Sequence, residues 1–254
     1  MSSETTRAPH ASNPGAFPST QWSMVLHAGA DSESQVRAAL ESLCRQYWYP
    51  LYTFVRRQGR AHHETEDCTQ EFLARLIANA GMARARPERG RFRTFLLIAL
   101  RNFLTNEWHR AHAAKRGGGQ IPLPLEFDLA EKRFAREAPD PALTPEQVFD
   151  RHWAQSMIDR AVAELRGEYE ASGRGVLFAA LGPLIWHQSD AGKRTALAAQ
   201  LNLSPNAFTV ALQRLRRRLG ERLRSNVAQT VADPADVDAE LRHLISAMNE
   251  TAPT

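Results

Sequence analysis

The most informative segment of this chain reads Arg194-Thr-Ala-Leu-Ala-Ala-Gln-Leu-Asn-Leu-Ser-Pro-Asn-Ala-Phe-Thr-Val-Ala-Leu-Gln-Arg-Leu-Arg-Arg-Arg-Leu219. Its first part predicts a short helix that ends in a turn at Asn202, since asparagine tolerates the left-handed backbone that such a turn needs. Ser204 then predicts a helix cap, with Pro205 at the first helical position. The segment therefore predicts a helix-turn-helix.

The second helix of this segment has one apolar and one polar face. Apolar residues recur at i, i+4, i+7 and i+11 from Phe208 to Leu219, which places them on one side. The other side combines hydroxyl, amide and guanidinium groups, which can bind base edges and phosphates in a DNA major groove. A solvated face would more often carry Glu and Lys, so we interpret this helix as a recognition helix. The residues expected to contact DNA are Ser204, Asn206, Thr209, Gln213, Arg214 and Arg217. Further positive charge comes from Arg216, Arg218, Arg222 and Arg224.

Positive charge is concentrated in a few stretches of this 254-residue chain, whose formal net charge is +4. Arginine dominates residues 84–93, 110–116 and 214–224, a pattern that suggests contacts with a polyanion such as nucleic acid. No apolar run approaches the roughly 20 residues of a membrane-spanning helix, and the polar start lacks a signal-peptide core, so we expect a cytoplasmic protein. Cys44 and Cys68 have no paired metal spacing and are expected to be free thiols.

Apolar residues recur mostly at helical spacing, so we expect an all-α protein with two small helical domains. Residues 1–19 lack periodicity and are expected to be a disordered tail. The first domain is expected over residues 20–116, with helices at 21–28, 36–58, 64–80 and 93–114. Residues 117–144 contain three consecutive glycines and four prolines, and we expect them to form a flexible linker.

The second domain is expected over residues 145–225. It opens with Thr144-Pro145-Glu146-Gln147, which predicts a capping box and a long helix. A shorter helix at 176–186 then leads into the helix-turn-helix.

A C-terminal extension, residues 226–254, follows the second domain. Asp233-Pro234 predicts a helix start, and apolar residues then recur at i, i+4, i+7, i+8 and i+11. This apolar face comprises Val237, Leu241, Leu244, Ile245 and Met248. Such a short helix needs a partner surface, so we expect it to pack on the protein's own domains or on a regulator.

Three segments of the N-terminal half occur in a characteristic order. They read Leu51-Tyr-Thr-Phe-Val-Arg-Arg57, Glu66-Asp-Cys-Thr-Gln-Glu-Phe-Leu-Ala-Arg-Leu76 and Gly90-Arg-Phe-Arg-Thr-Phe-Leu-Leu-Ile-Ala-Leu-Arg-Asn-Phe-Leu104. In order and spacing they resemble region 2 of the extracytoplasmic-function (ECF) sigma factors, a class of the sigma-70 family of RNA polymerase sigma factors. Residues 194–220 resemble region 4 of the same class. The resemblance covers roughly residues 20–225 and implies a transcription initiation factor, not an enzyme, that directs core RNA polymerase to promoters.

The resemblance implies a docking helix for the polymerase. In this class an Asp-x-x-Gln-Glu-x-Phe helix binds the clamp helices of the beta-prime subunit. The implied docking residues are Asp67, Gln70, Glu71 and Arg75. Their spacing of i, i+3, i+4 and i+8 places them on one side of a helix. A solvated acidic face is the plain alternative for this helix taken alone.

Two promoter contacts are implied as well. Residues 92–116 resemble the part of region 2 that opens the minus-ten element, and loop 84–91 sits where the class places its base-capturing loop. The implied DNA-binding residues are Arg91, Arg93, Arg101, Asn102, Asn106, Trp108, His109, Arg110, Lys115 and Arg116. Phe92 and Trp108 could stack on an unpaired base or belong to the core, and for Trp108 the core is favoured. By the same resemblance, region 4 reads the minus-thirty-five element as duplex and touches the beta flap.

Two other functions compete with this interpretation. A conventional helix-turn-helix regulator would never meet the polymerase core, and the docking motif argues against it. A metal-dependent nuclease would have to draw on Glu64, Glu66, Asp67, Glu71, His62, His63, His109 and His112. That acidic cluster has no second set of similar spacing, and the chain has no Gly-rich phosphate loop. We therefore expect no catalytic residue, no cofactor and no metal. The expected partners are promoter DNA, core RNA polymerase and an anti-sigma or other regulatory protein.

Overall fold

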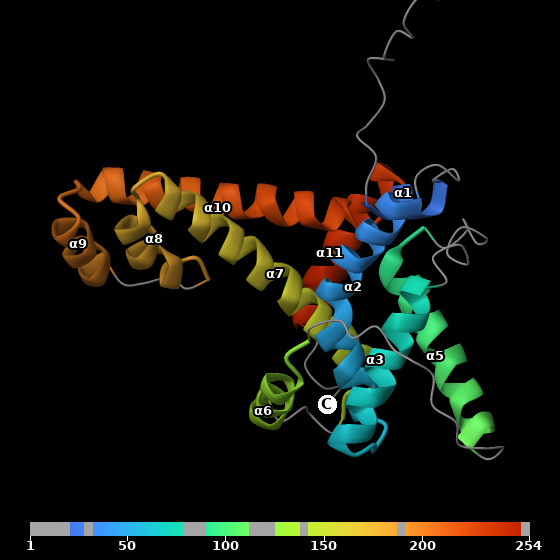
Figure 1. Ribbon diagram of the computed structural model, residues 1–254. Coiled ribbons are helices and arrows are strands. Elements are labelled where there is room, and N and C mark those ends of the chain that lie inside the picture. Colours follow the sequence, from blue (N-terminus) through green and yellow to red (C-terminus); the bar gives the residue numbers. More distant parts are fainter. Residues whose placement is uncertain are drawn as a thin grey trace, which may run out of the picture.

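The computed structural model describes residues 21–27, 33–78, 90–111, 125–137, 142–186 and 191–249. These ranges are helical throughout apart from loops and one isolated bridge between Arg91 and Val231, so the expected all-helical fold is confirmed for them. The N-terminal helices are α1 (Gln21–His27), α2 (Glu33–Arg56), α3 (His62–Ala78) and α5 (Phe92–Ala111). They are followed by α6 (Phe127–Glu137), α7 (Pro145–Ala171), α8 (Gly175–Leu181), η2 (Gly182–Leu184), α9 (Ala191–Gln200), α10 (Pro205–Ala228), η3 (Pro234–Asp236) and α11 (Val237–Asn249) (Figure 1). No helix among the described residues is long and apolar enough to cross a membrane.

Local signals fix the starts of α7 and α10 where the sequence predicted them. The Thr144 side chain accepts a hydrogen bond from the Gln147 backbone, and the Gln147 side chain accepts one from the Thr144 backbone, which completes the capping box of α7. The Ser204 side chain caps α10, and Asn202 has a φ of 54° in the turn before it. The turn between α9 and α10 therefore follows from short-range chemistry.

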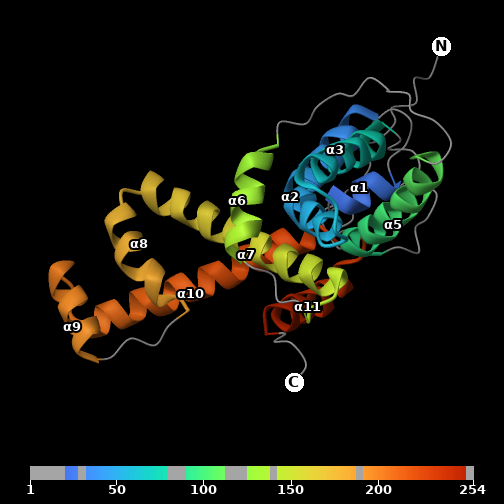
Figure 2. The same ribbon diagram turned by 90° about the horizontal axis from the view of Figure 1, so that it is seen from below.

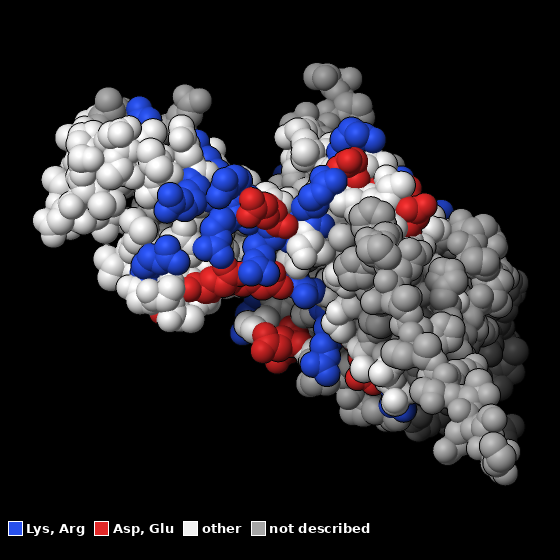
Figure 3. All heavy atoms as spheres, turned by 90° about the horizontal axis from the view of Figure 1, so that it is seen from above, with Lys and Arg blue, Asp and Glu red and all other residues white. Residues whose placement is uncertain are grey.

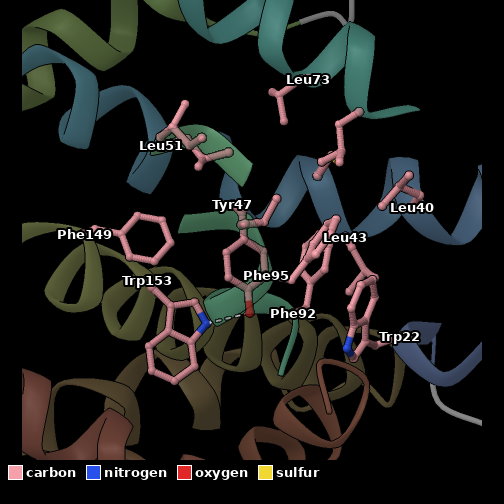
Figure 4. Close-up of a cluster of buried hydrophobic side chains, with 14 of the residues drawn as sticks. Trp22, Leu40, Leu43, Tyr47, Leu51, Leu73, Phe92, Phe95, Phe149 and Trp153 are labelled. Carbon is pink, nitrogen blue, oxygen red and sulfur yellow. Dashed lines mark hydrogen bonds between the residues drawn. The ribbon is translucent and has the colours of Figure 1, made fainter. Parts of the chain in front are cut away.

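The larger core draws on both halves of the chain. Trp22 of α1, Tyr47 of α2, Phe92 of α5 and Trp153 of α7 are fully buried in it (Figure 4). The Trp153 indole donates a hydrogen bond of 2.9 Å to the Tyr47 hydroxyl, and the Tyr47 and Phe92 rings meet edge-on at 5.0 Å. The first half of α7 therefore completes the core of the N-terminal helices.

The C-terminal extension belongs to the same core. The Phe92 backbone donates to the Thr230 carbonyl at 2.9 Å, and the Trp22 backbone donates to the Gln229 carbonyl at 3.1 Å. Helix α11 then adds buried side chains to this core. Of the two partners expected for the C-terminal helix, the structure shows the protein's own helices.

The apolar face of α11 differs from the expected one at one position. Val237, Leu244 and Ala247 are buried, whereas Ile245 is 57% exposed. At 100° per residue, Ile245 lies about 100° around the helix from Leu244, at the edge of the apolar stripe. The buried face is centred on Leu244 instead.

A second core lies at the other end of the molecule. It comprises the second half of α7, together with α8, α9 and α10, and includes Leu165, Phe178, Ala198, Phe208 and Leu215. Helices α7 and α10 contact each other and run from one core to the other (Figures 1 and 2). The expected boundary at residue 145 therefore does not separate the two cores, because α7 contributes to both.

The segment expected to be a flexible linker contains helix α6, which corrects that expectation. Phe127 and Ala130 are buried against Tyr49 and Tyr52 of α2, and Phe134 packs beside them. The glycines and prolines that suggested a linker occur before and after this helix, outside the described residues. These glycines and prolines obscured the apolar spacing i, i+3 and i+7 of Phe127, Ala130 and Phe134. The three side chains become buried or half-buried only because they pack on α2.

Candidate functional site

Helix α3 presents the acidic face that the sequence predicted. Asp67 is exposed and makes no hydrogen bond or ion pair with any described residue, while Gln70 and Glu71 are half-buried. Arg75 pairs with Glu71, and its Nη1 lies 3.0 Å from a carboxylate oxygen of Glu107 on α5. The four expected residues thus lie on one side of α3, but Arg75 forms its ion pairs within the protein. Asp67 is the carboxylate left open to a partner.

Helix α5 presents the first part of the expected polar face within its described side chains. Arg101, Asn102 and Asn106 are exposed on it, and Arg101 pairs with Glu146 of α7. Phe92 is fully buried, so of its two expected roles the structure supports the core. The expected positions that fall outside the described side chains are Trp108, His109, Arg110, Lys115 and Arg116.

Arg93 does not face solvent, which corrects its expected role in binding DNA. Its side chain is 9% exposed, and it donates hydrogen bonds to Glu240 at 3.0 Å and to Asp150 at 2.9 Å. Its guanidinium also lies over the Trp153 ring, 5.1 Å from the centroid. Arg91 pairs with Glu240 as well, at 3.4 Å. Sequence reasoning missed these partners because they lie 57 and 147 residues from Arg93 along the chain.

Helix α10 displays most of the expected recognition residues. Asn206, Gln213, Arg214 and Arg217 are exposed along it, and Arg217 lies 3.5 Å from Glu221. Thr209 is also exposed and occupies the same face, although its hydroxyl donates to the Pro205 carbonyl at 3.0 Å. Ser204 is used as the helix cap. Arg214 makes no hydrogen bond or ion pair with any described residue, so its charge is open to a ligand.

The other arginines of α10 hold the fold together and do not extend this face. Arg218 and Arg222 both pair with Glu168 of α7. Arg216 donates to the backbone carbonyls of Leu184 and Ile185, and Arg224 pairs with Asp238. Figure 3 shows the resulting mixture of basic and acidic side chains along this part of the surface. The positive surface is therefore narrower than the run of arginines suggested.

Two carboxylates of α6 were not singled out by the sequence. Burial alone would raise the pKa of Glu137, but hydrogen bonds from His152, Arg133 and Tyr49 outweigh it and lower the pKa to about 2. The Tyr49 hydroxyl donates to Glu137 at 2.6 Å. Glu131 accepts hydrogen bonds from Arg56 and from Tyr52. These contacts hold α6 against α2 and α7.

Both cysteines are buried and free, as expected. Burial raises the pKa of Cys68 to about 11, so its thiol stays protonated and is a poor nucleophile. One set of side chains that could hold a metal, His62, His63 and Glu66, lies among the described residues.

Comparison with known proteins gives one match. Residues 43–114 match the family model of sigma-70 region 2, which covers the second half of α2 together with α3 and α5. No curated protein and no solved structure matches the chain. The matched segment contains both the acidic face of α3 and the polar face of α5. Residues 43–114 are therefore a sigma-70 region 2 domain, a domain of the RNA polymerase sigma factors that initiate transcription.

Proposed function

We propose that this protein is a sigma factor of the ECF class, which brings core RNA polymerase to promoters through two DNA-binding surfaces. The observation that carries the proposal is the combination of a region 2 match with a capped helix-turn-helix at α9 and α10. A chain with only one of these elements would be consistent with many other proteins. Together they support an arrangement in which region 2 is followed by region 4.

Helix α3 is proposed to dock on the clamp helices of the beta-prime subunit. Asp67 is exposed and without a described partner, so it is free to accept a hydrogen bond from the polymerase. Gln70 and Glu71 lie on the same side, and the pair between Glu71 and Arg75 holds this side in place. Association through such a face would depend on electrostatic complementarity.

Helix α5 is proposed to bind the minus-ten element. Asn102 and Asn106 are exposed one turn apart, and Arg101 supplies a cation beside them. Amide groups of this kind can bind the base edges of an exposed strand, and arginine can bind its phosphates. The proposal drops Arg93. It keeps the remaining sequence-based candidates, Arg91, Trp108, His109, Arg110, Lys115 and Arg116.

Helix α10 is proposed to enter the major groove of the minus-thirty-five element. Its N-terminal turns carry Asn206 and Thr209, and Gln213 and Arg214 follow on the same face. Region 4 is further proposed to contact the beta flap. Summing two modest DNA contacts at a fixed separation would let the holoenzyme distinguish its promoters from other DNA.

Size-exclusion chromatography with bacterial core RNA polymerase tests this function. The wild-type protein is expected to co-elute with the core enzyme, and the double variant Asp67→Ala/Gln70→Ala is expected to lose the complex. Asp128→Ala, which removes an exposed carboxylate from α6, is the matched control and should bind like wild type. A wild-type protein that never binds core polymerase would instead point to a conventional helix-turn-helix regulator.

A further inference from the structure

Three side chains with metal-ligating groups meet at the start of α3, one turn before Asp67 and Gln70. One donor atom from each of His62, His63 and Glu66 lies within 4.8 Å of the other two. At 100° per residue, Glu66 lies about 40° around the helix from His62, between the two histidines and one turn further along. The helix geometry therefore holds the three donors on one side.

We propose that His62, His63 and Glu66 bind a divalent transition metal ion such as zinc. Two imidazoles and one carboxylate are a donor set that zinc accepts, and three protein ligands leave a fourth position for water. Calcium and magnesium would prefer oxygen donors alone. The donor set thus selects for zinc, cobalt, nickel or copper.

The hydrogen bonds around His62 determine which of its nitrogens carries a proton. Arg56 donates two hydrogen bonds to Glu131, so the Glu131 carboxylate is an acceptor. The Tyr52 hydroxyl donates its only proton to Glu131. Tyr52 lies 2.9 Å from His62 Nδ1 and can now only accept a hydrogen bond there.

His62 Nδ1 must therefore be the protonated nitrogen. In the neutral ring the lone pair is then on Nε2, the nitrogen that does not contact Tyr52. A histidine whose N–H is held by a buried oxygen while its other nitrogen is free is the arrangement that metal-binding histidines show. The pair Tyr52 and Glu131 thus prepares His62 to bind a metal.

The geometry needs only small side-chain movements to accept an ion. Zinc–ligand distances of about 2.0–2.2 Å put tetrahedral donors about 3.4 Å apart. The donor atoms of the three side chains lie within 4.8 Å of one another, so they must approach one another to bind an ion. His63 is exposed, and His62 and Glu66 are half-buried, so their side chains can rotate. The partial positive charge at the start of α3 opposes a cation, and Glu64 in the same turn offsets it.

A metal bound here would be linked to three helices. His62 belongs to α3, Tyr52 to α2 and Glu131 to α6, and these three residues form one chain of hydrogen bonds. Metal binding makes the imidazole N–H a stronger donor to Tyr52. The ion is therefore expected to stabilise the contact of α6 with α2, and to raise the melting temperature of the protein.

Metal titration of the untagged, chelator-treated full chain tests the site. Zinc is titrated by calorimetry, and cobalt by the visible absorption that intensifies in tetrahedral sites. Wild type is expected to bind one ion at this site, and His63→Ala and Glu66→Gln are each expected to weaken binding by about 10-fold or more. Glu64→Gln is the matched control, because it removes a neighbouring charge without removing a ligand. Unchanged binding in His63→Ala and Glu66→Gln, or equal loss in Glu64→Gln, would overturn the proposal.

The variant Tyr52→Phe tests the hydrogen bonds behind His62. It removes only a hydroxyl, and loss of such a partner typically weakens metal binding by about 10–100-fold. Circular dichroism without metal establishes that the variant is folded. A folded Tyr52→Phe protein that binds zinc as tightly as wild type would contradict the site as described.

Discussion

Arg93 and Glu240 form an ion pair whose side chains are 9% and 1% exposed. Removing one member of a buried pair leaves the other charge without its partner and typically costs about 3–5 kcal/mol. Glu240→Ala is therefore expected to lower the free energy of unfolding by about 3–5 kcal/mol, measured by urea denaturation. Asp150 still pairs with Arg93 in this variant, which favours the lower end of that range.

Asp238→Ala is the control for this prediction. Asp238 lies on the same helix, and its pair with Arg224 is exposed on both sides. Exposed pairs contribute little, so the stability of this variant should match wild type within error. Equal destabilisation of the two variants would contradict the prediction that the buried pair contributes more to stability than the exposed pair.

The lowered pKa of Glu137 predicts how the stability of the protein depends on pH. Its pKa is lowered from 4.5 to about 2 in the folded protein, so its stabilising effect is complete above pH 4.5 and is lost as the pH falls towards 2. Glu137→Gln cannot ionise and lacks this effect. The variant should be less stable than wild type at pH 7, and the difference should shrink between pH 5 and pH 2. Urea denaturation across this range measures it, and a constant difference would be the contrary result.

Sequence reasoning failed at single residues where the partner is distant in the chain. No residue close to Arg93 in the sequence indicates that Glu240 will neutralise its charge. The sequence around an arginine does not distinguish one that binds phosphate from one that binds a carboxylate. The exposure of Asp67, in contrast, was predictable because it follows from helical spacing alone.

At the scale of helices, α10 carries arginines that are paired within the protein and one that is paired with no described residue. Arg214 has no described partner, whereas Arg218 is bound to Glu168 of α7. Arg214→Ala is expected to weaken promoter binding by the holoenzyme by about 1–3 kcal/mol and to leave stability unchanged. Arg218→Ala should instead lower stability and leave DNA affinity nearly unchanged. Fluorescence anisotropy with labelled promoter DNA and urea denaturation distinguish the two, and the reverse pattern would refute the assignment.

Helix ends were predictable because their signals are local. The capping box at Thr144 and the cap at Ser204 each need only residues within one turn, so α7 and α10 begin where expected. Helix α6 was not predictable, because Phe127 and Ala130 are stabilised by tyrosines of α2 that lie more than 70 residues earlier in the sequence. Tertiary packing here overrides the composition of the surrounding segment.

At the scale of the whole molecule, the region 2 domain is completed by distant parts of the chain. The matched residues 43–114 supply Tyr47 and Phe92, but Trp153 of α7 and Val237 of α11 close the same core. Helices α7 and α10 also reach the second core. The region 2 domain is therefore expected to unfold together with the C-terminal extension.

Truncation after Asn226 tests this dependence. It removes Val227, Val237 and Leu244 from the larger core and leaves the surface of Phe92 and Trp153 without its cover. The truncated protein is expected to lose more helical circular dichroism than the deleted residues account for, and to be cleaved rapidly by protease within region 2. Because truncation can also act through aggregation, two point variants complete the test.

Leu244→Ala and Ile245→Ala differ in burial but lie side by side on α11. Leu244 is 2% exposed, so its truncation to alanine should cost about 2–5 kcal/mol of unfolding free energy. Ile245 is 57% exposed, and its variant should keep nearly all of the wild-type stability. A Leu244 variant as stable as wild type, together with a truncated protein that keeps a cooperative thermal transition, would show that the extension is an accessory to region 2. The expected result would show that the extension is part of the domain itself, because the region 2 domain then cannot fold without α11.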